Sequence, residues 1–273
     1  MTLNEAVKIL SDAGISSALY DARELFRHFA HSDEGELVLR TASSDCPALT
    51  DAVMRRARRE PLQYIIGSVC FYREEYFLSP HCLIPRSDTE ILVDCAIKNM
   101  PEGASFLDLC TGSGCVAISV LKNTVGTTAV AVDISAGALE MAQKNARHNG
   151  VDGRLTLTER DALSGVIDGK FDAILSNPPY VTSRAYEGLE PEIYYEPKAA
   201  FVGGEDGGDF YRYITKNYRD SLKDGGFIAY EIGYDQAEML LQIAKEAGMS
   251  CQIIKDLSGN DRVALLRQKR KQC

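Results

Sequence analysis

Four consecutive residues, Asn177-Pro178-Pro179-Tyr180, have the types best suited to chemistry in this chain, and they closely follow the apolar run 171–175. That run is typical of a buried strand, and neither proline can donate the backbone N–H that a continuing strand would need. We therefore expect the strand to end by Ser176. The turn that follows should be stiff, because the residue before each proline is pushed out of the helical region.

This proline turn (residues 177–180) would project from the carboxyl end of a strand, the edge at which open α/β sheets bind ligands. A planar –NH2 group offers two N–H donors and a π face. The side-chain oxygen of Asn177 and a carbonyl of the turn can each accept one N–H, while Tyr180 stacks on the plane. The alternative is a rigid turn that ends a strand and buries a tyrosine.

A second stretch, the glycine loop (Asp108-Leu109-Cys110-Thr111-Gly112-Ser113-Gly114), lies between an expected strand and an expected helix. Its glycines let the backbone pass close to a ligand, although Ala117 replaces the third glycine of the pyrophosphate fingerprint. Asp108 would repel a diphosphate but suits a ligand with an ammonium group. Asp133, 21 residues after Gly112, stands where an acidic residue would bind ribose hydroxyls. Together these features favour S-adenosylmethionine as the cofactor, with NAD as the alternative.

Other reactive side chains carry less information. Asp161-Ala162 follow the third expected strand, where an adenine edge would be met, although Asp161 could also be an ordinary loop carboxylate. Cys110 and Cys115 have no histidine nearby in the sequence, so we interpret them as small buried thiols rather than nucleophiles. The four histidines and eight cysteines show no metal-binding spacing. We assign the histidines no role and predict no metal.

The composition narrows the class of protein. The chain has 273 residues, enough for one large and one small domain, and 45% hydrophobic residues is an ordinary globular value. No apolar stretch approaches a membrane span, and the first residues lack a signal-peptide layout. With cysteines scattered and unpaired, we expect a cytoplasmic protein. The net charge of −9 argues against a main affinity for nucleic acid phosphates.

The expected elements fall into a helical part and an alternating part. A capping box formed by Thr2 and Glu5, and Pro47 at a first helical position, mark two of the helices in a small bundle over residues 1–65. The bundle helices are expected at 2–10, 18–31, 34–40 and 47–59. Arginines at 55, 56, 58 and 59 form either a solvated helix face or a docking surface for an acidic or RNA-rich partner.

Tyrosine, phenylalanine and isoleucine at 63–83 predict a β-hairpin between the two parts. Beyond it, strands are expected at 105–109, 128–132, 154–158, 171–175, 226–231, 250–255 and 262–267. Helices are expected at 114–122, 136–148, 208–222 and 235–247. The alternation predicts an α/β fold with a parallel, doubly wound sheet, to which the closing pair of strands adds an antiparallel strand.

Several segments together resemble the HemK-type protein-(glutamine-N5) methyltransferases: residues 61–67 (PLQYIIG), 84–86 (IPR), the glycine loop, Asp133 and the proline turn. Enzymes of that family methylate the glutamine in the Gly-Gly-Gln loop of peptide chain release factors. The resemblance covers nearly the whole chain, including Glu196-Pro197 and the glycines at 203, 204 and 207. It implies a class I S-adenosylmethionine-dependent methyltransferase with a Rossmann-like, seven-stranded mixed sheet.

The resemblance also implies domains, partners and site residues. The domains would be a helical substrate-docking domain (1–65), a β-hairpin linker (66–85) and a methyltransferase domain (86–273). The protein would act on release factors as a cytoplasmic monomer, without a membrane or a direct need for nucleic acid. Cofactor binding would fall to Asp108, Cys110, Thr111, Gly112, Ser113, Gly114, Asp133, Asp161, Ala162 and Asn177. The substrate glutamine would bind Asn177, Pro178, Pro179 and Tyr180, of which Asn177, Pro178 and Tyr180 would be catalytic.

Two positions depart from the family pattern. Cys110 stands where the family usually has glycine, which narrows the room around the methionine moiety if its Cβ faces the ligand. Ser87-Asp88 stand where Pro-Glu is usual. Three alternatives stay open: methylation of a ribosomal-protein glutamine, adenine-N6 methylation of nucleic acid by a similar turn, and a non-catalytic protein that binds S-adenosylmethionine.

Overall fold

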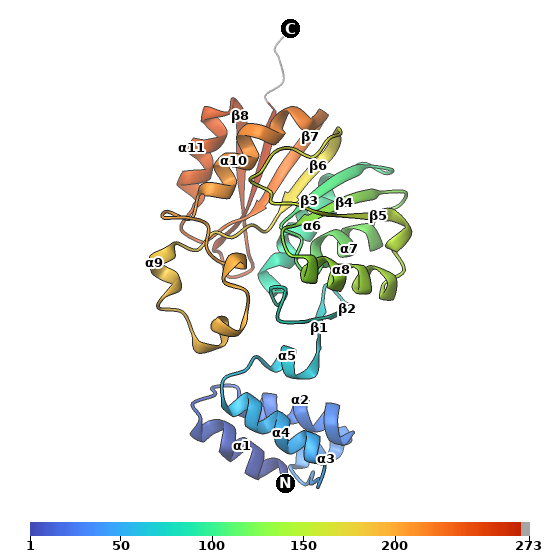
Figure 1. The fold of residues 1–273 in the computed structure, drawn as a ribbon, viewed down its shortest axis with the longest axis vertical. Helices are drawn as coiled ribbons and strands as arrows, with labels where there is room; N and C mark the ends of the chain where they lie inside the picture. Colours follow the sequence, from blue (N-terminus) through green and yellow to red (C-terminus); the bar gives the residue numbers. More distant parts are fainter. Residues whose placement is uncertain (269–273) are drawn as a thin grey trace. The chain divides into compact units, whose positions relative to one another are not determined.

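The computed structural model describes residues 1–268, which form two compact units (Figure 1). The first unit contains Met1–Ser68 together with Glu190–Tyr195. The second contains Val69–Leu189 and the described residues from Glu196 onward. Residues 269–273, at the end of the predicted methyltransferase domain, lie outside the described residues.

The first unit is a small helical bundle. It comprises α1 (Leu3–Asp12), α2 (Ala18–Ala30), α3 (Glu34–Leu39), α4 (Pro47–Ala57), α5 (Leu62–Ile66) and the 3-10 helix η3 (Pro191–Tyr195). The capping box is confirmed, because the Thr2 hydroxyl accepts the Glu5 backbone N–H and the Glu5 carboxylate accepts that of Thr2. Pro47 begins α4 as predicted. Apolar side chains at helical spacing fill the core of the bundle.

The predicted hairpin at 63–83 is wrong at both ends. Residues 62–66 form α5 instead, because Leu62 and Ile65 lie three residues apart and both pack into the helical core. The hairpin itself consists of β1 (Ser68–Phe71) and β2 (Glu74–Phe77). Its two-residue turn has positive φ at Tyr72 (49°) and Arg73 (71°), as a tight hairpin turn requires. The residue types before position 67 favour a strand, but the spacing of the buried residues Leu62 and Ile65 fits a helix, and the segment folds as one.

The second unit is built on a seven-stranded mixed sheet with the order β5-β4-β3-β6-β7-β9-β8. The strands are β3 (Ser105–Leu109), β4 (Thr128–Asp133), β5 (Leu155–Glu159), β6 (Phe171–Ser176), β7 (Leu222–Glu231), β8 (Met249–Lys255) and β9 (Asp261–Gln268). Strands β3 to β7 are parallel, and β9 runs antiparallel between β7 and β8. The prediction of a parallel sheet closed by an antiparallel strand is confirmed.

The strand order reverses at β3, which has β4 on one side and β6 on the other. Leu109, at the end of β3, pairs with Val132 of β4 and with Ser176 of β6. The segments that follow these three strands therefore meet at one edge of the sheet. Such a switch point is where open α/β sheets bind their ligands.

Helices cover both faces of this sheet (Figure 1). On one face α6 (Glu90–Asn99), α7 (Cys115–Lys122) and α8 (Ala136–His148) enclose a core that includes Phe106 and Leu175. On the other, α10 (Asp209–Tyr218) and α11 (Ala237–Glu246) enclose a core that includes Leu107 and Ile174. Neighbouring strand residues thus point into different cores, as expected for a sheet buried on both faces.

Short elements complete the chain: η1 (Ser87–Thr89), η2 (Asp152–Arg154), α9 (Ser183–Tyr186), η4 (Lys198–Ala200) and η5 (Arg219–Ser221). The expected helix at 208–222 is divided into α10 and η5. Within residues 1–268, none of the helices has the length and hydropathy needed to cross a bilayer. The same residues contain no cluster of three or more histidine, cysteine or acidic side chains that could hold a metal ion.

Candidate active site

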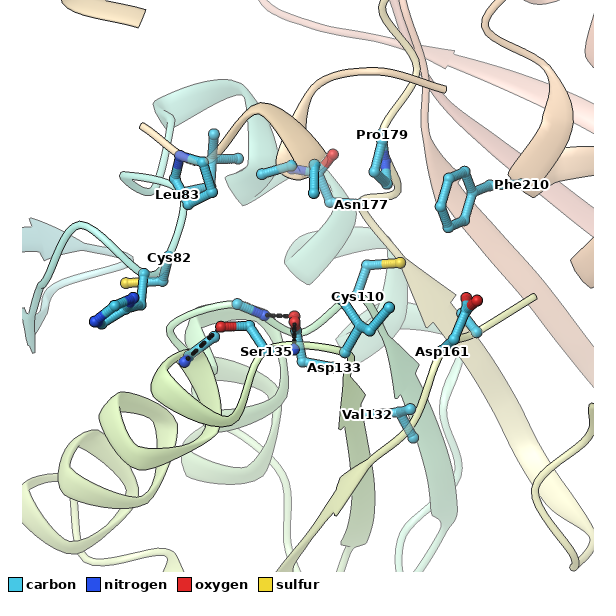
Figure 2. Close-up of a pocket in the computed structure, with 18 of the residues that line it drawn as sticks. Cys82, Leu83, Cys110, Val132, Asp133, Ser135, Asp161, Asn177, Pro179 and Phe210 are labelled. Carbon is cyan, nitrogen blue, oxygen red and sulfur yellow. Dashed lines mark hydrogen bonds between the residues drawn. The ribbon is translucent and has the colours of Figure 1, made fainter. Parts of the chain in front are cut away.

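A cavity of about 320 Å³ is lined by residues of the second unit that follow β3, β4 and β6. Its volume lies within the usual range for ligand pockets. The sequence-predicted residues on its wall are Cys110, Gly112, Asp133, Asp161, Ala162, Asn177 and Pro179. In Figure 2, Asn177, Pro179 and Phe210 lie along one side and Asp133 along the other, with Cys110 between them. The structure therefore brings the glycine loop, the β4 carboxylate and the proline turn to one cavity.

Three residues of the glycine loop adopt the left-handed conformation: Cys110 (φ 62°), Gly112 (φ 57°) and Gly114 (φ 81°). A Cβ on Gly114 would lie 2.9 Å from Ile118 and 3.1 Å from Ala142, so glycine lets α7 begin close to α8. At Cys110 a residue with a Cβ bears conformational strain that glycine would avoid. The loop geometry thus explains why glycine would be usual at position 110.

Asp108 lies beneath the loop rather than on the cavity wall, and it is buried together with Thr111 and Ser113. Its Oδ2 accepts a hydrogen bond from the Thr111 hydroxyl at 2.6 Å. Burial raises the pKa of Asp108 to about 7. These contacts suit a residue that shapes the loop, whereas a direct contact with an ammonium group stays a prediction.

Asp133 ends β4 and lies on the cavity wall. One carboxylate oxygen accepts the Gly112 backbone N–H at 2.8 Å, and the other accepts that of Ser135 at 3.0 Å (Figure 2). Burial raises the pKa of Asp133 above its usual value. Each oxygen keeps a further lone pair that can accept a hydroxyl hydrogen. The carboxylate is therefore held in place and still able to bind two hydroxyl groups.

Asp161, Ala162 and Cys110 are further predicted cofactor residues on the wall, and Cys115 begins α7 directly after the glycine loop. Asp161 and Ala162 both line the cavity, and one oxygen of Asp161 accepts the Leu163 backbone N–H at 2.8 Å. Burial raises the pKa of the Cys110 thiol far above its usual value and that of Cys115 to about 12. Both thiols stay protonated near neutral pH, which argues against nucleophiles; Cys115 is buried, whereas Cys110 is half-buried on the cavity wall.

The proline turn follows β6 and exposes only part of itself to the cavity. Asn177 and Pro179 lie on the wall, whereas Pro178 and Tyr180 do not. The Asn177 amide nitrogen donates to the hydroxyl of Thr89 at 3.2 Å. A Cβ on Gly203 would lie 2.3 Å from the Pro179 carbonyl oxygen, so the segment beside the turn requires glycine there.

The residues that hold this turn were not among the predicted site residues. Thr89 and Glu231 are both 2% exposed, and Glu231 accepts a hydrogen bond from the Tyr180 hydroxyl at 3.2 Å. Burial raises the pKa of Glu231 to about 7. An acidic residue that ends an apolar strand at the ligand-binding edge was an available signal for Glu231. The sequence around Thr89 is typical of a helix start, which gave no sign of its contact with Asn177.

The connector before η1 also contributes to the wall through His81, Cys82 and Leu83. Giving the histidines no role therefore overlooked His81, whose ring lies so close to Gly137 that a Cβ there would approach it to 2.7 Å. The connector has no regular secondary structure, so no periodic pattern could predict its position. Arg86 pairs with the buried carboxylate of Glu196, which also accepts the Ile84 backbone N–H at 2.9 Å.

The arginine cluster of the first unit is largely committed to carboxylates of that unit. Arg56 is buried and pairs with Asp21 at 2.7 Å and with Glu192 at 3.1 Å. Arg59 also pairs with Glu192, at 2.7 Å, and Arg55 pairs with Glu60. Arg58 is exposed. The interpretation of this cluster as a docking surface therefore depends on Arg58, which is the exposed arginine among residues 55–59.

The fold and the cavity define a class I S-adenosylmethionine-dependent methyltransferase. Two family models match the chain, "PrmC N-terminal domain" at residues 2–67 and "Methyltransferase small domain" at residues 87–193. A release factor glutamine methyltransferase of Geobacter sulfurreducens is 42% identical over 77% of this chain and 74% of its own length. That of Caulobacter vibrioides is 36% identical over 94% and 91%. The chain belongs to the release factor glutamine methyltransferase family.

A solved structure supports the fold alone. The crystal structure of a methyltransferase from Pyrococcus furiosus matches 70% of this chain and 86% of its own chain, with a TM-score of 0.51 and 22% identity. This likeness agrees with the Rossmann-like sheet of the second unit. The predicted fold class and cofactor are thereby confirmed at the level of the family.

Proposed function

We propose that this protein transfers the methyl group of S-adenosylmethionine to the side-chain amide nitrogen (N5) of the glutamine in the Gly-Gly-Gln motif of peptide chain release factors. One observation carries the proposal: Gly112 and Asp133 line the same cavity as Asn177 and Pro179. The first pair suits a nucleoside with a ribose diol, and the second suits a planar amide. Donor and acceptor sites of these two kinds in one space are what methyl transfer requires.

The residues present fit S-adenosylmethionine, which when bound supplies a methyl group made electrophilic by its sulfonium charge. Asp133 would accept hydrogen bonds from the ribose hydroxyls, and Asp161 and Ala162 would meet the adenine. Among the lining residues two carboxylates stand against one arginine, Arg160, a balance that suits a cationic ligand. Cys110 would lie beside the methionine part.

Asn177, Pro178 and Tyr180 would prepare the acceptor. An amide nitrogen is a poor nucleophile because its lone pair is delocalised into the carbonyl. The Asn177 oxygen and the Pro178 carbonyl would accept both N–H groups, which turns the lone pair outward and stabilises positive charge that grows on nitrogen. Tyr180 would stack on the amide plane and align it. The N-methylated, protonated amide is acidic enough to lose its proton without a dedicated base.

The first unit would dock the protein substrate, with residues 1–65 as the docking domain, 66–85 as the linker and 86–273 as the methyltransferase domain. We expect a cytoplasmic monomer that needs no nucleic acid. Arg58→Glu should raise KM for a whole release factor but not for a short glutamine peptide, since only the former would reach the docking unit. Lys8→Glu, at another exposed basic residue of this unit, is the matched control. Equal KM changes for both substrates would contradict docking through Arg58.

The proposed function is tested with radiolabelled S-adenosylmethionine and four acceptors: a release factor, the same factor with its Gly-Gly-Gln glutamine changed to alanine, a ribosomal-protein fraction, and duplex DNA. Label on the intact factor alone supports the proposal. Label on both factors equally, on ribosomal protein alone or on DNA would overturn the assignment of the acceptor.

A further inference from the structure

Glu231, the last residue of β7, is a buried carboxylate that the proposed mechanism does not use. Its Oε1 accepts the hydrogen bond from Tyr180, and its Oε2 is buried and has no hydrogen-bond partner among residues 1–268. The charged groups that face it are Arg262 of β9 and Asp88 of η1. Arg262 already pairs with Asp88 at 3.1 Å and with Asp256 at 3.2 Å, so its charge is shared among several carboxylates.

Thr89 connects this carboxylate to Asn177. A hydroxyl has one hydrogen to donate and lone pairs that accept. The Thr89 oxygen accepts the N–H of the Asn177 amide at 3.2 Å. The Thr89 side chain also lies close to Glu231 and favours its charged form, although burial of Glu231 has the larger, opposite effect on its pKa. Because Thr89 is buried, its hydrogen needs a protein acceptor, and Oε2 of Glu231 is a buried acceptor that still lacks a donor among residues 1–268.

We propose that Glu231 is a positioning residue that sets the direction of the hydrogen bonds at Asn177 and Tyr180. Oε1 of Glu231 accepts from Tyr180, as in the structure, and in this proposal Oε2 accepts from Thr89, because a carboxylate can only accept. Thr89 must then accept from Asn177, which turns the amide nitrogen of Asn177 toward Thr89. The Asn177 oxygen is left as the acceptor for the N–H of a substrate amide. This inference rests on the proposed function, since it explains how Asn177 presents its oxygen.

A neutral group at position 231 would no longer fix which of Thr89 and Asn177 donates the hydrogen bond between them. A glutamine amide could donate to Thr89, and Thr89 could then donate to the Asn177 oxygen. Asn177 would present its own N–H to the substrate N–H, and the two donors would repel. Burial raises the pKa of Glu231 to about 7 despite the opposing effect of Arg262. The same reversal is therefore expected when the pH falls through that value.

The direction of the bonds can be tested without methyl transfer. In asparagine-15N-labelled protein, the side-chain signal of Asn177, assigned with Asn177→Ala, is followed by NMR from pH 5 to 9. We expect this signal to shift with a midpoint near pH 7, and the shift to be lost in Glu231→Gln and Thr89→Val but kept in Thr89→Ser. If Glu231→Gln does not fold, the two Thr89 variants decide. A shift that persists in Thr89→Val or Glu231→Gln, or no shift in the wild type, would overturn the proposal.

The same variants are then assayed for methyl transfer to a release factor. Glu231→Gln should lower kcat about 10²-fold, in the range for losing one aligned polar group, without changing KM for S-adenosylmethionine. Its kcat should also lose the rise through pH 7. Asp172→Asn, a carboxylate-to-amide change at the other end of β6, should leave kcat unchanged.

An unchanged kcat and pH profile in Glu231→Gln would contradict the positioning role. If the NMR shifts are as expected but the wild type transfers no methyl group, the proposed function is wrong, while the proposed hydrogen bonds among Glu231, Thr89 and Asn177 are supported.

Discussion

The Tyr180 hydroxyl donates a hydrogen bond to Oε1 of Glu231 at 3.2 Å, which ties the end of the proline turn to the end of β7. The two residues are 51 positions apart, and the parallel pairing of β6 with β7 brings them together. Gln236 supports the same residue, because its amide donates to the Tyr180 carbonyl at 2.9 Å. The acceptor turn is therefore fixed by the neighbouring strand, while Asn177 reaches the cavity.

Asn177→Ala should lower kcat for methyl transfer at least about 10²-fold, the effect of removing one polar group aligned with a transition state. Binding of S-adenosylmethionine, measured by calorimetry, should change much less, because the glycine loop and Asp133 stay intact. Asn217→Ala, whose amide bonds the Tyr213 carbonyl on α10, is the control. Near-normal turnover in Asn177→Ala would contradict the role of the turn.

The free energy of unfolding should depend on pH through Glu231. Its pKa rises from 4.5 to about 7 on folding because of burial. Between these values the folded state holds a proton that the unfolded state has lost, so stability falls as the pH rises, by about 1.4 kcal/mol per pH unit. Relative to Glu231→Gln, the wild type should lose about 3 kcal/mol between pH 4.5 and 7. Urea unfolding at several pH values measures this difference, and a constant difference would show that Glu231 titrates normally.

Position 110 should tolerate glycine and reject branched residues, because its φ is 62°. Cys110→Gly removes strain but loosens the unfolded chain, so its stability should stay within about 1 kcal/mol of the wild type. Cys110→Val should lose about 2 kcal/mol or more, since a β-branched residue fits this conformation worst. Thermal unfolding with and without S-adenosylmethionine measures both effects. Equal stability of the two variants would contradict the strain.

Gly203→Ala should displace the proline turn, since the new Cβ would lie 2.3 Å from the Pro179 oxygen and 2.9 Å from the Tyr180 Cα. A shift of this size can cost about 10²-fold in kcat. Gly153→Ala is the matched control, because a Cβ at that position has no atom within 4 Å. The kcat values of the two variants measure the effect. A Gly203→Ala enzyme with normal kcat would show that catalysis tolerates a displacement of the proline turn.

Arg56 should matter far more to the stability of the helical unit than Arg58. Arg56→Ala would leave the buried carboxylate of Asp21 without its partner, at a cost of about 3–5 kcal/mol. Arg58→Ala changes an exposed side chain and should cost less than about 0.5 kcal/mol. Denaturant unfolding of the full chain compares them. Equal effects would mean that the buried ion pair is weaker than its geometry indicates.

Local patterns predicted much of this molecule. The Thr2 and Glu5 capping box, the end of β6 before the prolines and the placement of Asp133 each depend on neighbouring residues or on strand–helix alternation. Contacts between residues far apart in the sequence could not be predicted from local patterns. Thr89 lies 88 positions from Asn177, and Glu192 joins the helical unit through Arg56, 136 positions earlier. His81 lies on a connector without periodicity, and only the folded chain shows that it lines the cavity.

The central claim is that the Asn177 turn directs a methyl group to a glutamine side chain. It is tested most directly by tandem mass spectrometry of a release factor after incubation with the protein and S-adenosylmethionine. We predict a mass increase of one methyl group on the side chain of the Gly-Gly-Gln glutamine, and none when Asn177→Ala replaces the wild type. A methyl group on another residue, or on that glutamine at the same rate with Asn177→Ala, would contradict the account.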